Sequence, residues 1–154
     1  MSTVWLDADQ QLAWRRYLEG RARLHDAIGR EHDAHLSVSL EEYEVLVRLS
    51  ESPTESVRMS SLADGLAHSR SRTTHTVRRM EDRGLVRRGP VPGDRRGVLC
   101  TLTEEGRRTL VAEAPAHVAA VRRYLVDVLT PDQLRTLGEA MDAVTARCRE
   151  DGVC

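Results

Sequence analysis

Arginine and hydroxyl side chains are concentrated between His68 and Gly97. This segment has nine arginines and three acidic residues, a local charge of +6, whereas the rest of the chain has 14 basic and 21 acidic residues. The whole chain therefore stays near neutral, at −1. A basic segment in an acidic chain is the electrostatic footprint of a protein that binds a polyanion such as nucleic acid. A basic surface that contacts only solvent would have the same composition. The spacing of the residues is therefore needed to distinguish a nucleic-acid-binding segment from such a surface.

Two helix patterns with a tight break between them lie in and just before this segment. Ser60 or Ser61 can cap a short first helix. After a break at His68, Ser69 can cap a second helix that runs to about Asp82. The second helix of such a pair fits the major groove of DNA, where Arg can read guanine and hydroxyls can hold phosphates. The residues expected to contact DNA here are Ser60, Ser69, Arg70, Ser71, Arg72, Thr73, Thr74, His75, Arg78 and Arg79.

A β-hairpin is predicted directly after the second helix. Two strand-like runs, Leu85–Arg88 and Val98–Thr101, are joined by a loop rich in Pro and Gly over Gly89–Gly97. An Arg at the tip of such a hairpin fits the narrow minor groove of DNA, where the negative potential is enhanced. Asp94 is expected to orient Arg96 through an ion pair. The expected DNA contacts of the hairpin are Arg87, Asp94, Arg95 and Arg96.

Longer helices are predicted on both sides of the basic segment. Apolar residues recur at helical spacing from Asp7 to about Ala34. A capping box over Ser39–Glu42 starts a further helix. Thr103 and Thr130 are the expected caps of two C-terminal helices. Long helices at the ends of a small chain commonly pack against a partner chain, so a dimer is expected.

These elements predict a single domain over residues 1–154. It is mainly α with a small β wing, a winged helix-turn-helix in the order α-α-α-α-β-β-α-α. Residues 37–103 form the DNA-binding head. The helices over 5–35 and 104–150 form the dimer interface and position two such heads for binding to DNA.

Short motifs from Met59 to Gly106 resemble a known family. They are Ser61-Leu62-Ala63, Ser69-x-Ser71-x-Thr73-Thr74-x-x-Val77, Met80-Glu81-x-x-Gly84-Leu85-Val86-x-Arg88, Asp94-x-Arg96 and Leu102-Thr103-x-x-Gly106. In these motifs the chain is similar to the MarR family of bacterial transcription regulators. The resemblance implies a winged helix-turn-helix dimer with an interface of terminal helices, and many members release DNA when a small ligand binds. The chain departs from the family pattern at Met80, where Leu is more common.

A pocket for a small effector is expected, by the same resemblance, where the first, second and fifth helices meet the head. The ligand-binding residues expected there are Trp14, Tyr17, Arg21, His25 and Tyr43. Aromatic walls with one Arg suit a phenolic or aromatic-acid ligand. Alternatively, Trp14 and Tyr17 belong to the core of the dimer interface.

Neither a metal site nor a cofactor site is expected. His25, His32 and His35 fall near one face of the first helix, and His117 lies on a later one, but imidazole sites need three or four converging ligands. Solvated or interface histidines are the simpler interpretation. The three cysteines, Cys100, Cys148 and Cys154, form no C-x-x-C pair; the first two read as small apolar residues.

Several classes of function are excluded on sequence grounds. The chain has no nucleophile–base constellation, P-loop or dinucleotide fingerprint, so it is not expected to be an enzyme. No run approaches about 18 apolar residues, so a cytoplasmic protein without a membrane partner is expected. The predicted function is a homodimeric repressor on a pseudo-palindromic operator in double-stranded DNA. The alternative is a winged-helix interaction module that regulates a partner protein instead of DNA.

Overall fold

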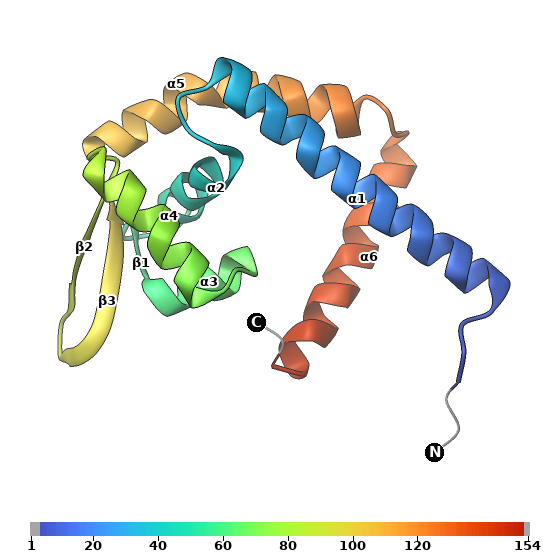
Figure 1. Cartoon of the computed structure of the whole chain (residues 1–154), viewed down its shortest axis with the longest axis horizontal. Coiled ribbons are helices and arrows are strands. Elements are labelled where there is room, and N and C mark those ends of the chain that lie inside the picture. Colours follow the sequence, from blue (N-terminus) through green and yellow to red (C-terminus); the bar gives the residue numbers. More distant parts are fainter. Residues whose placement is uncertain (1–3, 153–154) are drawn as a thin grey trace.

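Six α-helices and a three-stranded antiparallel sheet make up the computed structural model, which describes residues 4–152 (Figure 1). The predicted architecture, mainly α with a small β wing, is confirmed. The elements are α1 (Ala8–His35), α2 (Leu40–Ser50), β1 (Ser56–Arg58), α3 (Met59–Leu66), α4 (Arg70–Asp82), β2 (Val86–Val91), β3 (Asp94–Leu102), α5 (Glu104–Val121), a π-helical turn (Arg122–Val126) and α6 (Pro131–Glu150).

Most helices begin at the side-chain caps that the sequence predicted. Ser39 and Thr130 form full capping boxes, while Ser69 and Thr103 accept a hydrogen bond from the third residue of their helices. Helix α3 is the exception. It begins at Met59, and its N-cap makes no side-chain hydrogen bond, so neither of the two following serines caps it.

The sheet has the order β1-β3-β2, and its first strand was not predicted. Strand β1 pairs with β3 in the register Val57↔Cys100, and α3 begins at the residue that follows it. Three residues are too few for an alternating pattern to be visible in the sequence. The predicted loop of the hairpin is also much shorter in the structure, because β2 and β3 extend to a tight turn at Pro92 and Gly93, the latter with φ +77°. Pro90 is tolerated in β2 because this strand lies at the sheet edge.

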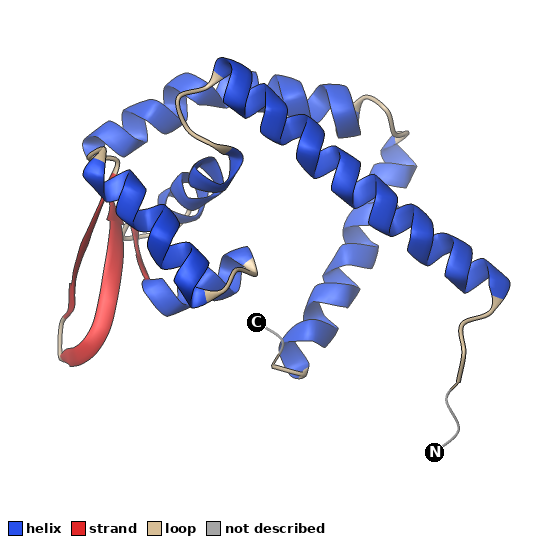
Figure 2. Cartoon of the chain, viewed as in Figure 1, coloured by secondary structure: helices blue, strands red, loops and turns tan. Residues whose placement is uncertain are grey.

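The core of the head lies between α2, α4 and the sheet (Figure 2). Val77 and Met80 of α4 are fully buried against Leu46 and Leu49 of α2, as their helical spacing predicted. Cys100 of β3 closes the same cluster from the sheet side. This packing holds α4 rigidly with one face inward and the opposite face at the surface.

Helices α1 and α6 are largely unpacked. Only Ile28 and His32 are buried on α1, and no residue of α6 is buried. Large apolar side chains on both helices are exposed, among them Leu12, Trp14 and Val144. Figure 1 shows α1 running away from the head, while α6 crosses α1 in this view and lies apart from the head. None of the helices described over residues 4–152 has the length and apolarity needed to span a membrane.

Candidate nucleic-acid interface

Helices α3 and α4 form the predicted helix-turn-helix pair. The turn is made by Ala67, which adopts the left-handed conformation with φ 51°, followed by the N-cap Ser69. The Ser69 hydroxyl accepts a hydrogen bond from the backbone N–H of Arg72 at 3.2 Å. Local hydrogen bonds therefore fix the angle at which α4 starts.

The predicted DNA contacts of the pair lie at the surface with one exception. Thr73 is 1% exposed, and its hydroxyl donates to the Ser69 carbonyl oxygen at 3.2 Å. A side chain buried to this degree cannot reach a nucleotide, so the prediction for Thr73 is wrong and its role is to hold the turn. The exposed residues of this set are Ser60, Ser69, Arg70, Ser71, Arg72, Thr74, His75, Arg78 and Arg79.

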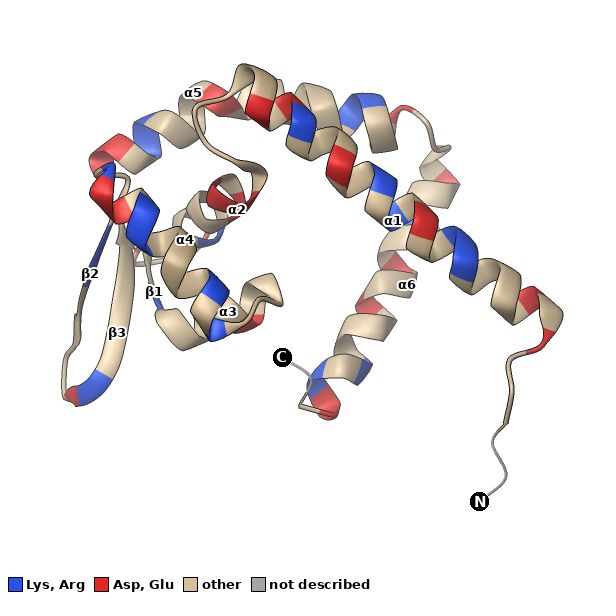
Figure 3. Cartoon of the chain, in the orientation of Figure 1, with Lys and Arg blue, Asp and Glu red and all other residues tan. Residues whose placement is uncertain are grey.

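A basic hollow of about 210 Å³ separates the start of α4 from the wing. Arg70 of α4, Arg96 of β3 and Arg58 of β1 all line it, together with Ser60 and Thr74. Sequence reasoning missed Arg58 because the strand that carries it was not recognised. Figure 3 shows arginines along α4 and at the wing tip, whereas acidic and basic residues alternate along α1. A hollow of this size, with three guanidinium groups around it, suits a phosphate group.

The wing tip is organised differently from the prediction. Asp94 Oδ2 accepts a hydrogen bond from Arg58 Nη1 at 2.6 Å, and Oδ1 accepts from the backbone N–H of Arg96 at 3.0 Å. The predicted ion pair between the Asp94 and Arg96 side chains is therefore wrong, because the carboxylate holds the backbone at Arg96 and leaves its guanidinium exposed. The Arg58 hydrogen bond, followed by the Arg96 amide, lowers the pKa of Asp94 below its ordinary value. Arg87 and Arg95 are exposed on the same hairpin.

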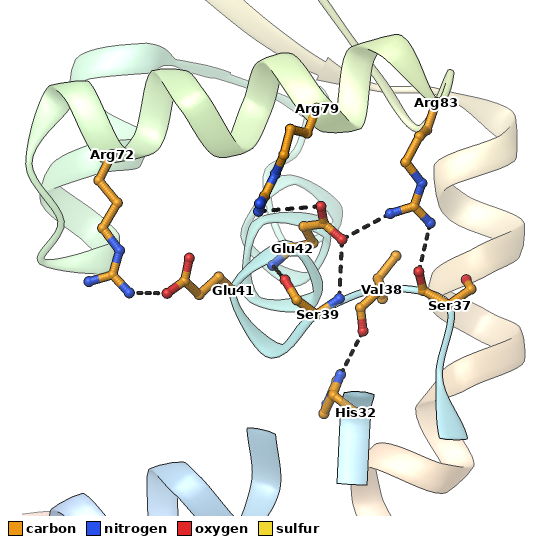
Figure 4. A network of polar contacts seen from close by, with 9 residues as sticks. All are labelled: His32, Ser37, Val38, Ser39, Glu41, Glu42, Arg72, Arg79 and Arg83. Atoms are coloured by element: carbon orange, nitrogen blue, oxygen red, sulfur yellow. Dashed lines mark hydrogen bonds and ion pairs between the residues drawn. The ribbon is translucent and has the colours of Figure 1, made fainter. Parts of the chain in front are cut away.

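Three arginines on one side of α4 and at its C-cap point toward α2 and remain partly exposed to solvent (Figure 4). Arg72 pairs with Glu41, and Arg79 Nη2 lies 3.6 Å from Glu42 Oε1. Arg83 Nη1 donates to Glu42 Oε2 at 3.0 Å. Arg72 and Arg79, which the sequence predicted as DNA contacts, thus have carboxylate partners on α2, and the arginines of α4 fall into two rows.

The five predicted ligand-binding residues do not meet. Trp14 and Tyr17 stack on each other, with ring centroids 5.6 Å apart, on an exposed part of α1, where Arg21 and His25 are exposed too. Tyr43 is buried elsewhere, on α2. The predicted pocket is therefore wrong in its lining, because only Tyr43 faces a hollow between the helices.

Tyr43 lies beside two histidines at the junction of α1, α2 and α5. It stacks on His117 with centroids 4.2 Å apart, and His117 Nδ1 is 3.0 Å from His32 Nε2. The buried His32 also bonds to the Val38 carbonyl through Nδ1 at 3.1 Å. Burial, and then the neighbouring His32, lower the pKa of His117. A hollow of about 300 Å³ opens here, lined by Tyr43, Glu44, Val47, Arg48, Gly65, Leu66 and His117.

The other side chains considered for metal or redox chemistry are dispersed. Among residues 4–152, no three His, Cys, Asp or Glu residues are arranged to hold a metal ion. Burial raises the pKa of the Cys100 thiol to about 12, so it stays protonated and unreactive. Cys148, expected as a small apolar residue, is exposed on α6, and Cys154 lies outside the described residues.

Comparisons with known proteins give a consistent result. A sequence model of the MarR family matches residues 36–97. AbsC, a MarR family transcriptional regulator from Streptomyces coelicolor, is 39% identical with a TM-score of 0.86, covering 96% of this chain and 99% of that chain. Sco3205, a MarR family transcriptional regulator from the same organism solved in complex with DNA, is 42% identical with a TM-score of 0.86, covering 93% and 89%.

A more distant solved structure shares the fold. CouR from Rhodococcus jostii RHA1, bound to p-coumaroyl-CoA, is 23% identical with a TM-score of 0.73, covering 92% of this chain and 96% of that chain. A comparison with curated proteins gave no significant match.

Proposed function

Because the chain belongs to the MarR family of DNA-binding transcriptional regulators, we propose that it is a homodimeric repressor, released from a pseudo-palindromic operator by a small ligand. The observation that carries this proposal is the basic hollow between α4 and the wing. Arg58, Arg70 and Arg96 come from three separate elements and meet there. Asp94 neutralises Arg58 in the free protein, whereas Arg70 and Arg96 have no carboxylate partner among the described residues and are available to a phosphate.

The two arms of the head bind different grooves. The exposed residues on the outer face of α4, including Arg70, Ser71 and Arg78, enter the major groove and read base edges. The wing places Arg96 at the adjacent minor groove. Arg58 and Ser60 hold the phosphate between the two grooves. Sco3205, 42% identical and solved in complex with DNA, supports DNA as the partner of this head.

Two copies of the chain associate through α1 and α6. Several of their apolar side chains are exposed in a single chain, among them Leu12 and Trp14 on α1 and Leu137 and Val144 on α6. Burying exposed apolar area is the main driving force of such association. A dimer of this kind brings the two α4 helices to about 34 Å, one turn of DNA.

The ligand occupies the hollow beside Tyr43 and His117. The Tyr43 ring gives an aromatic wall, His117 a hydrogen-bonding group and Arg48 a cation, a set that suits an aromatic carboxylate or phenolic acid. CouR, which is solved with p-coumaroyl-CoA, gives an example of an aromatic acid derivative bound by this fold. A ligand that binds more tightly to a conformation in which the two heads do not fit the operator shifts the population away from the conformation that binds DNA.

Selection of bound duplexes from a random DNA pool tests the proposal. The selected site should be an inverted repeat, and its affinity should fall by about 10³-fold or more between 50 and 200 mM salt. Phenolic acids that raise the Tm in a thermal-shift screen should release the selected duplex. A protein that enriches no sequence, and binds a partner protein with an affinity insensitive to salt, would instead be an interaction module.

A further inference from the structure

Three arginines, two along one side of α4 and one at its C-cap, are paired with carboxylates of α2. Arg72, Arg79 and Arg83 point away from the outer face of the helix and toward Glu41 and Glu42 (Figure 4). Within residues 4–152, Arg70 and Arg78 of the outer face have no carboxylate partner. The positive charge of α4 is thus divided between an unpaired row and a neutralised row.

The two carboxylates differ in what they do. The side chain of Glu42 is 7% exposed and also accepts a hydrogen bond from the Ser39 backbone N–H at 3.1 Å, so it is an internal brace for the start of α2. Arg83 reinforces this brace by donating to the Ser37 carbonyl oxygen at 2.7 Å. Removing Glu42 would leave a helix cap and two arginines without their partner.

Glu41 has a simpler environment. Its side chain is 28% exposed, its only hydrogen-bond partner among the described residues is Arg72, and the Arg72 side chain is 49% exposed. The Arg72 hydrogen bond lowers the pKa of Glu41, so the carboxylate stays charged at neutral pH. A half-exposed pair of this kind contributes little to stability. The position of the pair matters more, since Arg72 lies in the first turn of α4 and is itself one of the expected DNA contacts.

We propose that Glu41 masks Arg72: its carboxylate occupies the guanidinium that would otherwise bind a DNA backbone phosphate, and so limits sequence-independent affinity. Carboxylate and phosphate oxygens are alternative partners for the same guanidinium fork. While Arg72 is held by Glu41, the affinity of the head depends more on the outer face of α4, which reads base edges. This inference rests on the proposed DNA-binding function.

Glu41→Gln tests the masking, because glutamine keeps the shape and removes the charge. Each new phosphate contact steepens the slope of log K against log salt concentration by about 0.9, or about 1.8 for the two heads of a dimer. We therefore expect Glu41→Gln to bind both the selected duplex and a scrambled duplex about tenfold more tightly at 50 mM salt, with this steeper slope. Glu51→Gln is the matched control, since it removes the same charge at the C-cap of α2, outside the hollow beside Tyr43, and Glu51 has no arginine partner in the described chain.

A double mutant separates unmasking from a general charge effect. In an Arg72→Gln background, Glu41→Gln should no longer change the slope, and Arg72→Gln alone should leave the slope of the wild-type protein nearly unchanged. Weaker DNA binding by Glu41→Gln would overturn the inference, because it would mean that Glu41 positions Arg72 for DNA. A slope equal to that of Glu51→Gln would overturn it too. Failure of the wild-type protein to bind any duplex would instead remove the proposed function itself.

Discussion

The Asp94 carboxylate binds the Arg58 guanidinium, with Oδ2 2.6 Å from Nη1, and thereby ties the turn of the wing to the first strand of the sheet. Its other oxygen accepts the backbone N–H groups of Arg96 at 3.0 Å and Gly97 at 3.1 Å. One acidic side chain thus fixes the backbone from which Arg96, the arginine proposed to enter the minor groove, extends. This explains why a negative charge stands in a surface that is otherwise built for a polyanion.

Replacing Asp94 by Ala should weaken DNA binding by about tenfold on every sequence, since a loosened tip loses an ordered minor-groove contact. The direction of the change in affinity distinguishes two effects, because removal of a negative charge beside DNA would by itself strengthen binding. Equilibrium binding to the selected and scrambled duplexes measures the effect. Glu51→Ala, at the exposed C-cap of α2, serves as the control, and tighter binding by Asp94→Ala would contradict the positioning role.

Arg96→Ala and Arg70→Ala should have different consequences. Loss of Arg96 removes a groove contact that senses shape and potential, so affinity should fall by about tenfold on all sequences. Loss of Arg70 removes a base contact, so discrimination at one position of each half-site should fall by about tenfold. Binding to a panel of single-base operator variants distinguishes the two. Undiminished binding and unchanged preference in both variants would refute the DNA-binding surface.

Glu42→Ala should lower the free energy of unfolding by about 2 kcal/mol, because it removes a capping contact and leaves Arg79 and Arg83 without their carboxylate. The partner arginines are 49% and 40% exposed, so water replaces part of the lost interaction and the cost stays below that of a deeply buried pair. Urea unfolding gives the value. Glu44→Ala, on the same helix, should cost less than about 0.5 kcal/mol.

Gly106→Ala should destabilise the protein by about 3 kcal/mol, since a Cβ there would meet the backbone carbonyl oxygen of Leu85 and lie 2.9 Å from Leu102 Cδ1. Backbone cannot move aside as a flexible side chain does. Gly138→Ala in α6 is the matched control: nothing lies within 4 Å of its added Cβ, so it should be neutral or stabilise by up to about 1 kcal/mol. Equal effects of the two substitutions would disprove the close approach of α5 to Leu85.

Acidification should destabilise the junction at His117. Burial, and then His32, lower the pKa of His117, so the folded protein binds this proton less readily than the unfolded chain does. The stabilising contribution is therefore complete above the ordinary histidine range near 6.5 and is lost as the pH falls below it. We expect the Tm to fall by a few degrees from pH 7.5 to 5.5, and by less in His117→Gln. An identical fall in both proteins would exclude His117 as the titrating group.

Much of the head could be predicted from local chemistry. Ser39, Ser69, Thr103 and Thr130 are caps whose partners lie within three residues, and they start their helices where the sequence indicated. Strand β1 escaped prediction for the opposite reason, since three residues become a strand only by pairing with β3. Because β1 was not predicted, Arg58, which belongs to that strand, was not predicted as a site residue either.

The sequence by itself determined the helix-turn-helix pair, the wing, the inward face of α4 and the family, because periodicity, caps and turn residues act over a few positions. The tertiary structure decided which partner each charged side chain takes. Arg72 meets Glu41 31 residues earlier in the chain, and Asp94 meets Arg58 36 residues earlier. Tyr43 meets His117 of α5 in the same way. Such pairs depend on how whole elements pack against one another, so the spacing of residues within any one element does not predict them.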